Sequence, residues 1–526
     1  MSTRAVVIGG GISGLASAAL LAHDGWEVDL VERADRLGGR ARVWEQDGFV
    51  FDAGPSWLLM PDVFDHFFRL LGTSVHEQLD LVRLDPGYRV FFERFPEPLD
   101  VRADRARNVA LFGSVEPGAD DALERYLDSA HEVYRLAVRR FLYGTYERTT
   151  SMVTPDVVRS IPRLAGLLTR SLHHHIARRF ADPRLQQILG YPAVFLGTSP
   201  DRAPSLYHLM SWMDLADGVY YPRGGFGTLI DAVERLARRA GVRIHTATEV
   251  TAVVVDRSGR RPRAAGVEIT DGAGRASVID ADTVVAAADL HHVETGLLPH
   301  DLQTYPERWW RMRDPGPGAV LVHLGVDGEL PQLAHHSLFF TADWDRNFRA
   351  IFDAPTRVPE PASAYVCRPS ATDPSVAPDG AENVFVLVPV PADVAIGRGG
   401  PEGTGDPLVE EIADAVIAQI AAWADVPDFA ERVVLRRTVG PGDFAADLHA
   451  WRGGALGPGH VLKQSAFFRA GNASRKVDGL LYAGSSTIPG IGLPMCLISA
   501  ELVLKRVRRD RSTGPLPEPL AVGVRR

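Results

Sequence analysis

Residues 4–22, RAVVIGGGISGLASAALLA, decide the fold that we expect for this chain. Ala5–Ile8 is a short apolar run rich in β-branched residues, which predicts a buried strand. It is followed by Gly9, Gly11 and Gly14 at the spacing GxGxxG, and then by a helical pattern of small residues. At this spacing one glycine allows the turn, one lets the backbone approach a pyrophosphate, and one lets the helix pack on the strand. The stretch therefore predicts a strand, a tight turn and a helix whose N-terminus faces phosphate groups.

The residues after this helix favour a dinucleotide site over an ordinary glycine-rich turn, which GxGxxG alone also allows. Gly25 ends the helix, and Glu27–Val31 (EVDLV) is typical of a second buried strand. Glu32 stands at the end of that strand, about 20 residues after the glycines, where an acidic residue accepts hydrogen bonds from a ribose. Together these residues predict a βαβ unit that binds a dinucleotide.

The composition is that of an ordinary globular protein, with 526 residues, 45% hydrophobic, 23% charged and a net charge of -9. A chain of this length is expected to form about two or three domains. The negative charge gives no reason to expect a nucleic acid partner. Two distant cysteines, Cys367 and Cys496, do not make a disulfide framework, which fits a reducing cytoplasm. No apolar run is a good membrane span, so any membrane contact is expected to be peripheral.

The stretch Arg33–Arg42 (RADRLGGRAR) differs from the ordinary helix that usually follows the acidic residue in NAD enzymes. Gly39 and its neighbour allow a tight turn, and Arg40 offers a charge-assisted donor to a phosphate. This continuation resembles the flavoprotein superfamily of amine oxidases, protoporphyrinogen oxidase and carotenoid desaturases, whose N-terminal pattern joins GxGxxG to E-x5-GG-R. Phe49–Trp57 (FVFDAGPSW) fits the same resemblance. The resemblance implies that the cofactor is FAD.

Two later parts of the chain resemble further cofactor-side segments of this superfamily. Residues 220–256 are typical of a helix, a glycine turn and two strands, and Asp282–Asp289 (DTVVAAAD) is typical of another buried strand. Gly479–Leu504 contains a strand, an irregular loop and a helix that starts near Leu493. We expect that helix N-terminus to face the electron-rich end of a reduced flavin.

The resemblance implies a set of cofactor-binding residues drawn from all of these segments. Val250, for example, is expected to pack near the adenine. The full set is Gly9, Gly11, Ser13, Gly14, Glu32, Gly39, Arg40, Gly54, Pro55, Val250, Gly484, Gly490, Gly492, Leu493 and Pro494.

The fold class that we expect is α/β, with a discontinuous Rossmann-like FAD-binding domain. Runs of β-branched residues after Gly318 predict a second, sheet-rich α+β domain that binds substrate and has a mostly antiparallel sheet. The expected parts are the FAD-binding domain (1–86, 219–317 and 467–508), a largely helical region that faces substrate and membrane (87–218), the sheet-rich substrate domain (318–466) and a disordered tail (509–526).

Motifs along almost the whole chain resemble the bacterial-type phytoene desaturases, which are FAD-dependent carotenoid desaturases. The resemblance implies that a hydride leaves an allylic carbon of a long polyisoprenoid for the flavin and that an adjacent proton is then lost. The cofactor supplies the difficult step, and the protein supplies binding and alignment. Ser485 is a departure, because many members of the wider superfamily carry an acidic residue there. The motifs include LAHHSLFF (333–340), FVLVPVP (385–391), LKQSAFFR (462–469) and YAGSSTIPGIGLP (482–494).

Asp156 and Arg159 form a D-x-x-R pattern that resembles the site of a proposed acid/base pair in the family, and they are the candidate catalytic residues. The alternative is that Asp156, which follows Pro155, only stabilises a helix N-terminus. No metal site is predicted, because the three histidines at 173–175 are consecutive and cannot all face one ion. Oxygen and a quinone stay open as the electron acceptor.

Residues 161–180 carry a basic amphipathic pattern that can lie on an anionic membrane. Apolar residues recur at three- and four-residue steps from Leu164 to Phe180, with arginines among and beside them. Because the implied substrate is a hydrocarbon that resides in the bilayer, we expect a cytoplasmic protein that binds the membrane peripherally. The alternative is a surface helix packed on its own domain.

Three other functions agree in part with these motifs. A different carotenoid-acting flavoprotein, such as a ketolase, an isomerase or a desaturase for shorter substrates, would share the cofactor site. An amine oxidase would favour an aromatic or acidic cage, and the middle motifs do not resemble one. A non-enzymatic prenyl-binding protein on the same fold would have a degraded nucleotide site, whereas the glycines and Glu32 are all present here.

Overall fold

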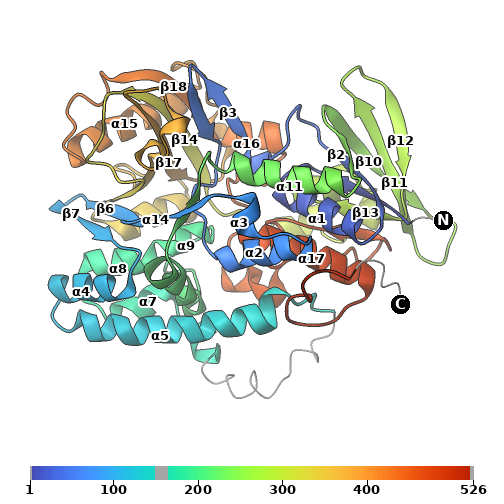
Figure 1. Ribbon diagram of the computed structural model, residues 1–526, viewed down its shortest axis with the longest axis horizontal. Helices are drawn as coiled ribbons and strands as arrows, with labels where there is room; N and C mark the ends of the chain where they lie inside the picture. The colour runs from blue at the N-terminus through green and yellow to red at the C-terminus, as the bar shows by residue number, and fades with distance from the viewer. Residues whose placement is uncertain (1–2, 148–163, 522–526) are drawn as a thin grey trace.

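The computed structural model describes residues 3–147 and 164–521. Asp156 and Arg159 lie outside the described residues. The first sheet contains five parallel strands that come from three distant parts of the chain (Figure 1). In sheet order they are β19 (Leu480–Tyr482), β13 (Thr283–Ala286), β1 (Arg4–Ile8), β2 (Glu27–Val31) and β9 (Arg243–His245).

Both faces of the five-stranded sheet are buried, which explains why β1 is apolar at consecutive positions. Ala5 and Val7 pack with a helical layer on one face, whereas Val6 and Ile8 pack with a three-stranded antiparallel sheet on the other. The helical layer contains α1 (Ile12–His23), α2 (Pro61–Leu70), α11 (Gly227–Arg239) and α17 (Leu493–Arg508). The three-stranded sheet contains β10 (Thr248–Asp256), β11 (Arg263–Asp271) and β12 (Ala276–Asp280).

A second large sheet has seven strands and is antiparallel except where β15 runs parallel to β6. Two of its strands, β6 and β7, come from the range 87–218, which we expected to be largely helical. They belong to the sheet because β6 pairs with β15, which carries the LAHHSLFF motif. In sheet order the strands are β18 (Val433–Val439), β14 (Gly318–Asp327), β17 (Ala381–Val390), β16 (Ala364–Cys367), β15 (His336–Phe340), β6 (Tyr88–Phe92) and β7 (Phe95–Val101).

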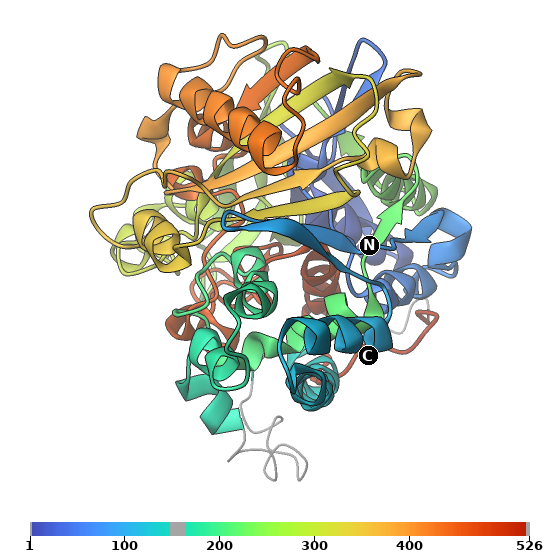
Figure 2. The same ribbon diagram turned by 90° about the vertical axis from the view of Figure 1, so that its left-hand side faces the viewer.

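This sheet lies between one helix on one face and a layer of several helices on the other (Figure 2). Val320, Val322 and Leu324 of β14 face α15 (Pro407–Trp423), whereas Leu321 faces the helices of residues 105–217. That helical layer consists of α4 (Arg105–Val115), α5 (Ala119–Ala137), α7 (Leu172–Ala177), α8 (Pro183–Gly190), α9 (Pro192–Phe195) and α10 (Met210–Trp212).

Shorter elements complete the described chain. They are two pairs of short strands and five further helices. The remaining elements are the strand pairs β3 (Val43–Gln46) with β4 (Phe49–Asp52) and β5 (Leu81–Arg83) with β8 (Tyr220–Pro222), and the helices α3 (Val75–Gln78), α12 (Leu290–Gly296), α13 (Glu307–Trp310), α14 (Trp344–Phe352) and α16 (Pro441–Leu448).

The apolar pattern of residues 161–180 points into the protein in its described part, which begins at residue 164. Leu172, Ile176 and Phe180 are each only 1% exposed, because they pack with α5 and α8 in one hydrophobic cluster. For these three residues the structure therefore agrees with the alternative prediction, in which the helix packs on its own domain. Among the residues that the structure describes, no helix is both long and apolar enough to cross a membrane.

The prediction of a disordered tail is wrong for residues 509–521. Leu516 and Leu520 are buried among the side chains of the first helical layer. The backbone N–H of Leu516 donates to Oε1 of Glu501 at 2.7 Å, and that of Leu520 donates to the carbonyl of Leu70 at 3.2 Å. The prolines and arginines of this segment suggested disorder. The burial of its two leucines stabilises the segment against the folded protein instead.

Candidate functional site

One cavity of about 780 Å³ brings together residues from the five-stranded sheet, the three-stranded sheet, the seven-stranded sheet and the helices beside them. It extends from the carboxyl ends of β1 and β2 to the second large sheet, through side chains of α5 and of residues 195–213. All of the predicted cofactor-binding residues line this cavity except Gly14 and Gly490. The cavity is therefore the candidate site for both cofactor and substrate.

One end of the cavity is the N-terminus of α1, where the sequence predicts the phosphates. Gly11 precedes this helix and gives it no side-chain cap, so the first N–H groups lack intrahelical partners. Gly9 has a φ of 99°, which only glycine adopts easily, and a β-carbon on Gly11 would have no protein atom closer than 3.9 Å. An uncapped helix end beside open space suits an anion such as a pyrophosphate. Gly14 does not line the cavity; it lets α1 pack against the turn.

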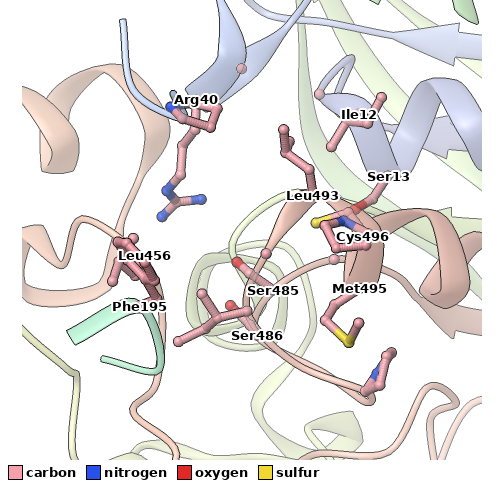
Figure 3. A pocket seen from close by; sticks show the side chains of 18 of the residues that line it. Ile12, Ser13, Arg40, Phe195, Leu456, Ser485, Ser486, Leu493, Met495 and Cys496 are labelled. Carbon is pink, nitrogen blue, oxygen red and sulfur yellow. The ribbon is translucent and has the colours of Figure 1, made fainter. Parts of the chain in front are cut away.

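Arg40 adds a buried positive charge to this end. Its Nε donates to the carbonyl of Ala455 at 2.9 Å, and its guanidinium points into the cavity (Figure 3). Burial lowers the pKa of Arg40, and the carboxylate of Asp289 opposes that effect. Burial likewise raises the pKa of Asp289, and Arg40 opposes it. The charge of Asp289 therefore favours a charged Arg40 guanidinium, which is the form that would bind phosphate oxygens.

Asp289 was missed as a site residue, although it ends the predicted strand DTVVAAAD. Its Oδ1 accepts from the N–H groups of His291 at 2.9 Å and His292 at 3.4 Å, so it caps α12. Helix-capping aspartates are common, and the sequence does not reveal that this one also faces Arg40.

Glu32 lines the cavity at the end of β2, where the sequence places a ribose partner. Its Oε2 accepts from the N–H of Gly10 at 2.6 Å, and its Oε1 accepts from the N–H of Ala34 at 2.8 Å. These two bonds fix the carboxylate beside the glycine turn. Each oxygen keeps a second lone pair for a hydroxyl donor. Val250 of β10 lines the same end of the cavity.

The loop 484–492 and the start of α17 lie beside the start of α1, since a β-carbon on Gly484 would be 3.5 Å from Oγ of Ser13. Ser485, Ser486 and Leu493 lie at the cavity surface there (Figure 3). Arg469 holds this loop, because it donates to the carbonyl of Thr487 at 3.0 Å and to that of Ser485. Burial lowers the pKa of Arg469 to about 10, so it stays charged at neutral pH. Arg469 lies in the LKQSAFFR motif, which was quoted for the resemblance but not assigned a role.

Gly490 does not line the cavity because the ring of His460 covers it. A β-carbon on Gly490 would stand 2.3 Å from that ring. The Nε2 of His460 accepts from the N–H of Ile491 at 3.2 Å, and its Nδ1 lies 2.7 Å from the hydroxyl of Tyr207. His460 and Tyr207 both line the cavity, and neither was predicted.

The rest of the lining is almost entirely hydrocarbon and aromatic. It comes from α5, from residues 138–146 and 164–168, from residues 195–213, from the second large sheet and from α16. Its apolar members include Val133, Leu136, Phe141, Leu164, Leu168, Phe195, Leu206, Leu209, Met210, Met213, Leu321, Leu387 and Phe444. Such a lining can hold a long apolar molecule next to the loop 484–492.

The fold and this cavity define a flavin-dependent oxidoreductase. The sequence matches the family model described as flavin containing amine oxidoreductase over residues 12–507. The chain therefore belongs to the flavin containing amine oxidoreductase family, and it is an FAD-dependent oxidoreductase. The residues present fit FAD, because an uncapped helix end and a buried guanidinium suit its pyrophosphate and a carboxylate suits its ribose.

Two relatives match nearly the full length of the chain. A carotenoid 3,4-desaturase from Haloarcula japonica is 41% identical over 505 residues, which cover 96% of this chain and 98% of the relative. A zeta-carotene-forming phytoene desaturase from Myxococcus xanthus is 34% identical over 504 residues, covering 96% of this chain and 93% of the relative. The predicted resemblance to carotenoid desaturases is confirmed by these matches.

Solved structures share the fold at low identity. An oxidoreductase from Methanosarcina mazei has a TM-score of 0.61 at 17% identity and covers 96% of this chain and 100% of its own. A putrescine oxidase bound to putrescine has a TM-score of 0.59 at 15% identity and covers 96% of this chain and 99% of its own. These similarities show the amine oxidase fold, with mixed helices and sheets, and nothing further.

Proposed function

We propose that this enzyme is a carotenoid desaturase, which converts single bonds of a long polyisoprenoid into double bonds. The observation that carries the proposal is the apolar part of the cavity, which is continuous with the loop expected to face the flavin. An amine substrate would need a cation-binding cage. The side chains around this part of the cavity are mainly leucine, methionine, valine and phenylalanine, with Trp57, Tyr146 and Tyr365 among them, so aliphatic side chains form much of a wall that a cation cage would build from aromatic rings. The identity to two desaturases supports the same conclusion.

We further propose that residues 1–86, 219–317 and 467–508 form the FAD-binding domain, because the five strands of the parallel sheet all come from these ranges. Bound FAD would accept the hydride from the allylic carbon. The N-terminus of α1 and Arg40 would hold its pyrophosphate, and Glu32 would hold a ribose. The apolar walls would align the chain of the substrate and keep water from the cation that hydride loss leaves.

Asp156 and Arg159 stay our proposal for the acid/base pair that takes up the second hydrogen as a proton. Substituting Asp156→Asn and Arg159→Gln, with FAD still bound, should slow the reduction of the flavin by substrate in a single turnover. Unchanged reduction in both variants would remove them from the reaction.

Two substrates are supported by different relatives. The match to a zeta-carotene-forming phytoene desaturase favours phytoene, whereas the match to a carotenoid 3,4-desaturase favours a substrate that is already conjugated. The test is expression in one bacterial strain that accumulates phytoene and in a second that accumulates a conjugated carotenoid. Chromatography and absorption spectra should show a longer polyene in one of them. If both pigments stay unchanged while the protein binds FAD, the proposed function is wrong.

We also propose that the cavity exchanges substrate with a membrane through a mouth beside Phe467. This side chain lines the cavity yet is 50% exposed, and Phe468 and Leu462 nearby are 60% and 41% exposed. The ring of Phe467 contacts Tyr146, with ring centroids 5.2 Å apart. Exposed apolar side chains at an apolar cavity opening are suited to dip into lipid.

A further inference from the structure

Three potential metal ligands, His335, His336 and Cys367, gather in the second large sheet, in a part of the protein that the proposed reaction does not use. His336 of β15 stands opposite Cys367 of β16 in an antiparallel pair, so their side chains share one face of the sheet. The ring centroid of His335 is 4.5 Å from that of His336. Each of the three residues offers a ligand atom within 4.8 Å of the other two. The pairing register of β15 and β16 therefore brings these residues together.

The cluster is deeply buried. His335 and Cys367 are each 4% exposed and His336 is fully buried. Cys367 is a free cysteine. In the described part of the chain, Nε2 of His335 and Nε2 of His336 have no hydrogen-bond partner. A buried polar atom without a hydrogen-bond partner destabilises the folded protein, so two such atoms in one cluster require an explanation.

The other ring nitrogen of each histidine does have a partner. Nδ1 of His335 lies 2.8 Å from Oγ1 of Thr372, and Nδ1 of His336 lies 2.8 Å from the hydroxyl of Tyr365. A hydroxyl oxygen can accept a hydrogen bond, and in the tautomer that carries its proton on Nδ1 each histidine keeps a free lone pair on Nε2. Histidines that bind metals have the same arrangement, in which a second group holds the N–H and directs the bare nitrogen at the ion.

We propose that His335, His336 and Cys367 bind a closed-shell d¹⁰ metal ion, Zn²⁺ or Cu⁺. Imidazole nitrogen and thiolate sulfur are the ligands that select these ions, whereas carboxylates and carbonyls would favour Mg²⁺ or Ca²⁺. On binding, the S–H bond of Cys367 breaks and its proton is released to water, a metal–sulfur bond forms, and no electron is transferred. The two ions differ in the charge that they leave, since the thiolate neutralises Cu⁺ but only half of the charge of Zn²⁺.

The position of the cluster indicates what such an ion does. The ring of His336 stacks on Trp57 with centroids 4.5 Å apart and an angle of 12° between the rings. Trp57 and Tyr365 both line the cavity. An ion bound by residues of β15 and β16 would therefore hold Trp57 and Tyr365 in place from the side that faces away from the cavity. It is a structural ion that does not contact the reacting atoms, and it does not depend on the identity of the substrate.

The test measures metal in the full-length protein with FAD bound, purified under reducing conditions without chelators. We expect about one equivalent of zinc or copper per chain by mass spectrometry of the elements. Competition with a Cu⁺-specific chelator distinguishes the two ions. The site is then emptied and titrated with Co²⁺, which should give the near-ultraviolet absorption of sulfur-to-cobalt charge transfer.

The matched variants are Cys367→Ser and Cys496→Ser, which each remove a buried free thiol. Cys367→Ser should lose the metal and the cobalt band, whereas Cys496→Ser should keep both. His336→Gln, checked by its FAD content and thermal unfolding, should also lose the metal. The proposal fails if the unaltered protein holds no metal as purified and takes up neither Zn²⁺ nor Cu⁺ afterwards. It also fails if Cys367→Ser binds as much metal as Cys496→Ser.

Discussion

A β-carbon on Gly14 would lie 1.9 Å from the carbonyl oxygen of Gly9, although four residues separate the two glycines along the turn. No side chain fits between these two atoms, so glycine at position 14 is what allows α1 to pack directly against the turn at Gly9. Gly14→Ala should therefore push the helix away and lower both FAD content and the free energy of unfolding, by about 1–3 kcal/mol for such overpacking. Thermal unfolding and the absorbance of retained flavin measure the two effects.

Gly11→Ala is the control for that substitution. Gly11 has a φ of -71°, which alanine also adopts, and its nearest protein atom would be 3.9 Å away. The variant should keep the stability of the cofactor-free protein and weaken FAD binding only, because the added methyl group would enter the open space in which the pyrophosphate is expected. If Gly14→Ala behaves like Gly11→Ala, the packing role assigned to Gly14 is wrong.

Glu32→Gln should weaken FAD binding about 10-fold to 100-fold, since a hydrogen bond to a charged group contributes about 1.5–3 kcal/mol. Both oxygens of Glu32 accept hydrogen bonds from backbone N–H groups, and the amide of glutamine has only one oxygen, so the substitution also loses one of these bonds. Flavin fluorescence during titration of the cofactor-free protein gives the dissociation constant. Glu45→Gln, on the exposed side of β3, should leave it unchanged. An equal affinity for the two variants would contradict the ribose assignment.

Asp214 should make stability depend on pH. Tyr88 and Tyr191 donate to its Oδ2 at 3.1 and 2.7 Å, and burial raises the pKa of this carboxyl from 3.8 to about 7. Between these values the folded protein keeps a proton that the unfolded chain has lost. The stabilisation is therefore complete below pH 3.8 and is lost as the pH rises through about 7. The free energy of unfolding should fall by at most about 1.4 kcal/mol per pH unit in this window.

The measurement compares urea unfolding of the unaltered protein and of Asp214→Asn at several pH values with FAD in excess. The amide cannot titrate, so the difference between the two curves isolates this one group. The difference should change steadily between about pH 4 and pH 7 and then level off. Parallel curves over that range would show that Asp214 is ionised in the folded protein.

The proposed membrane mouth predicts that Phe467→Ser combined with Phe468→Ser reduces binding to vesicles that contain anionic phospholipid. Burying a phenylalanine side chain contributes about 1.5–3 kcal/mol, so a loss of at least tenfold in the partition coefficient is expected. Met312→Ser is the control, because Met312 is 77% exposed but does not line the cavity. Sedimentation with vesicles measures the binding. Equal losses in the two variants would place the membrane contact elsewhere.

Local spacing predicted the elements whose contacts lie close together in the sequence. β1, the turn at Gly9, α1 and β2 appear at the expected residues because each is specified by its own apolar period and its own glycines. The strand β13 and the helix start at Leu493 were predicted for the same reason. The periodicity of residues 164–180 was also real, but a periodic pattern shows only that one face is apolar and not what covers it.

The sequence by itself determined that this chain binds a dinucleotide and resembles the carotenoid desaturases, because those conclusions rest on residues at fixed short spacings. Only the tertiary structure decided that Arg40 faces Asp289, that Leu516 and Leu520 hold the tail, and that His336 meets Cys367. These contacts join residues that are far apart along the chain. Strand register and the burial of apolar surface determine which residues make these contacts, and the local spacing of residues predicts neither of the two.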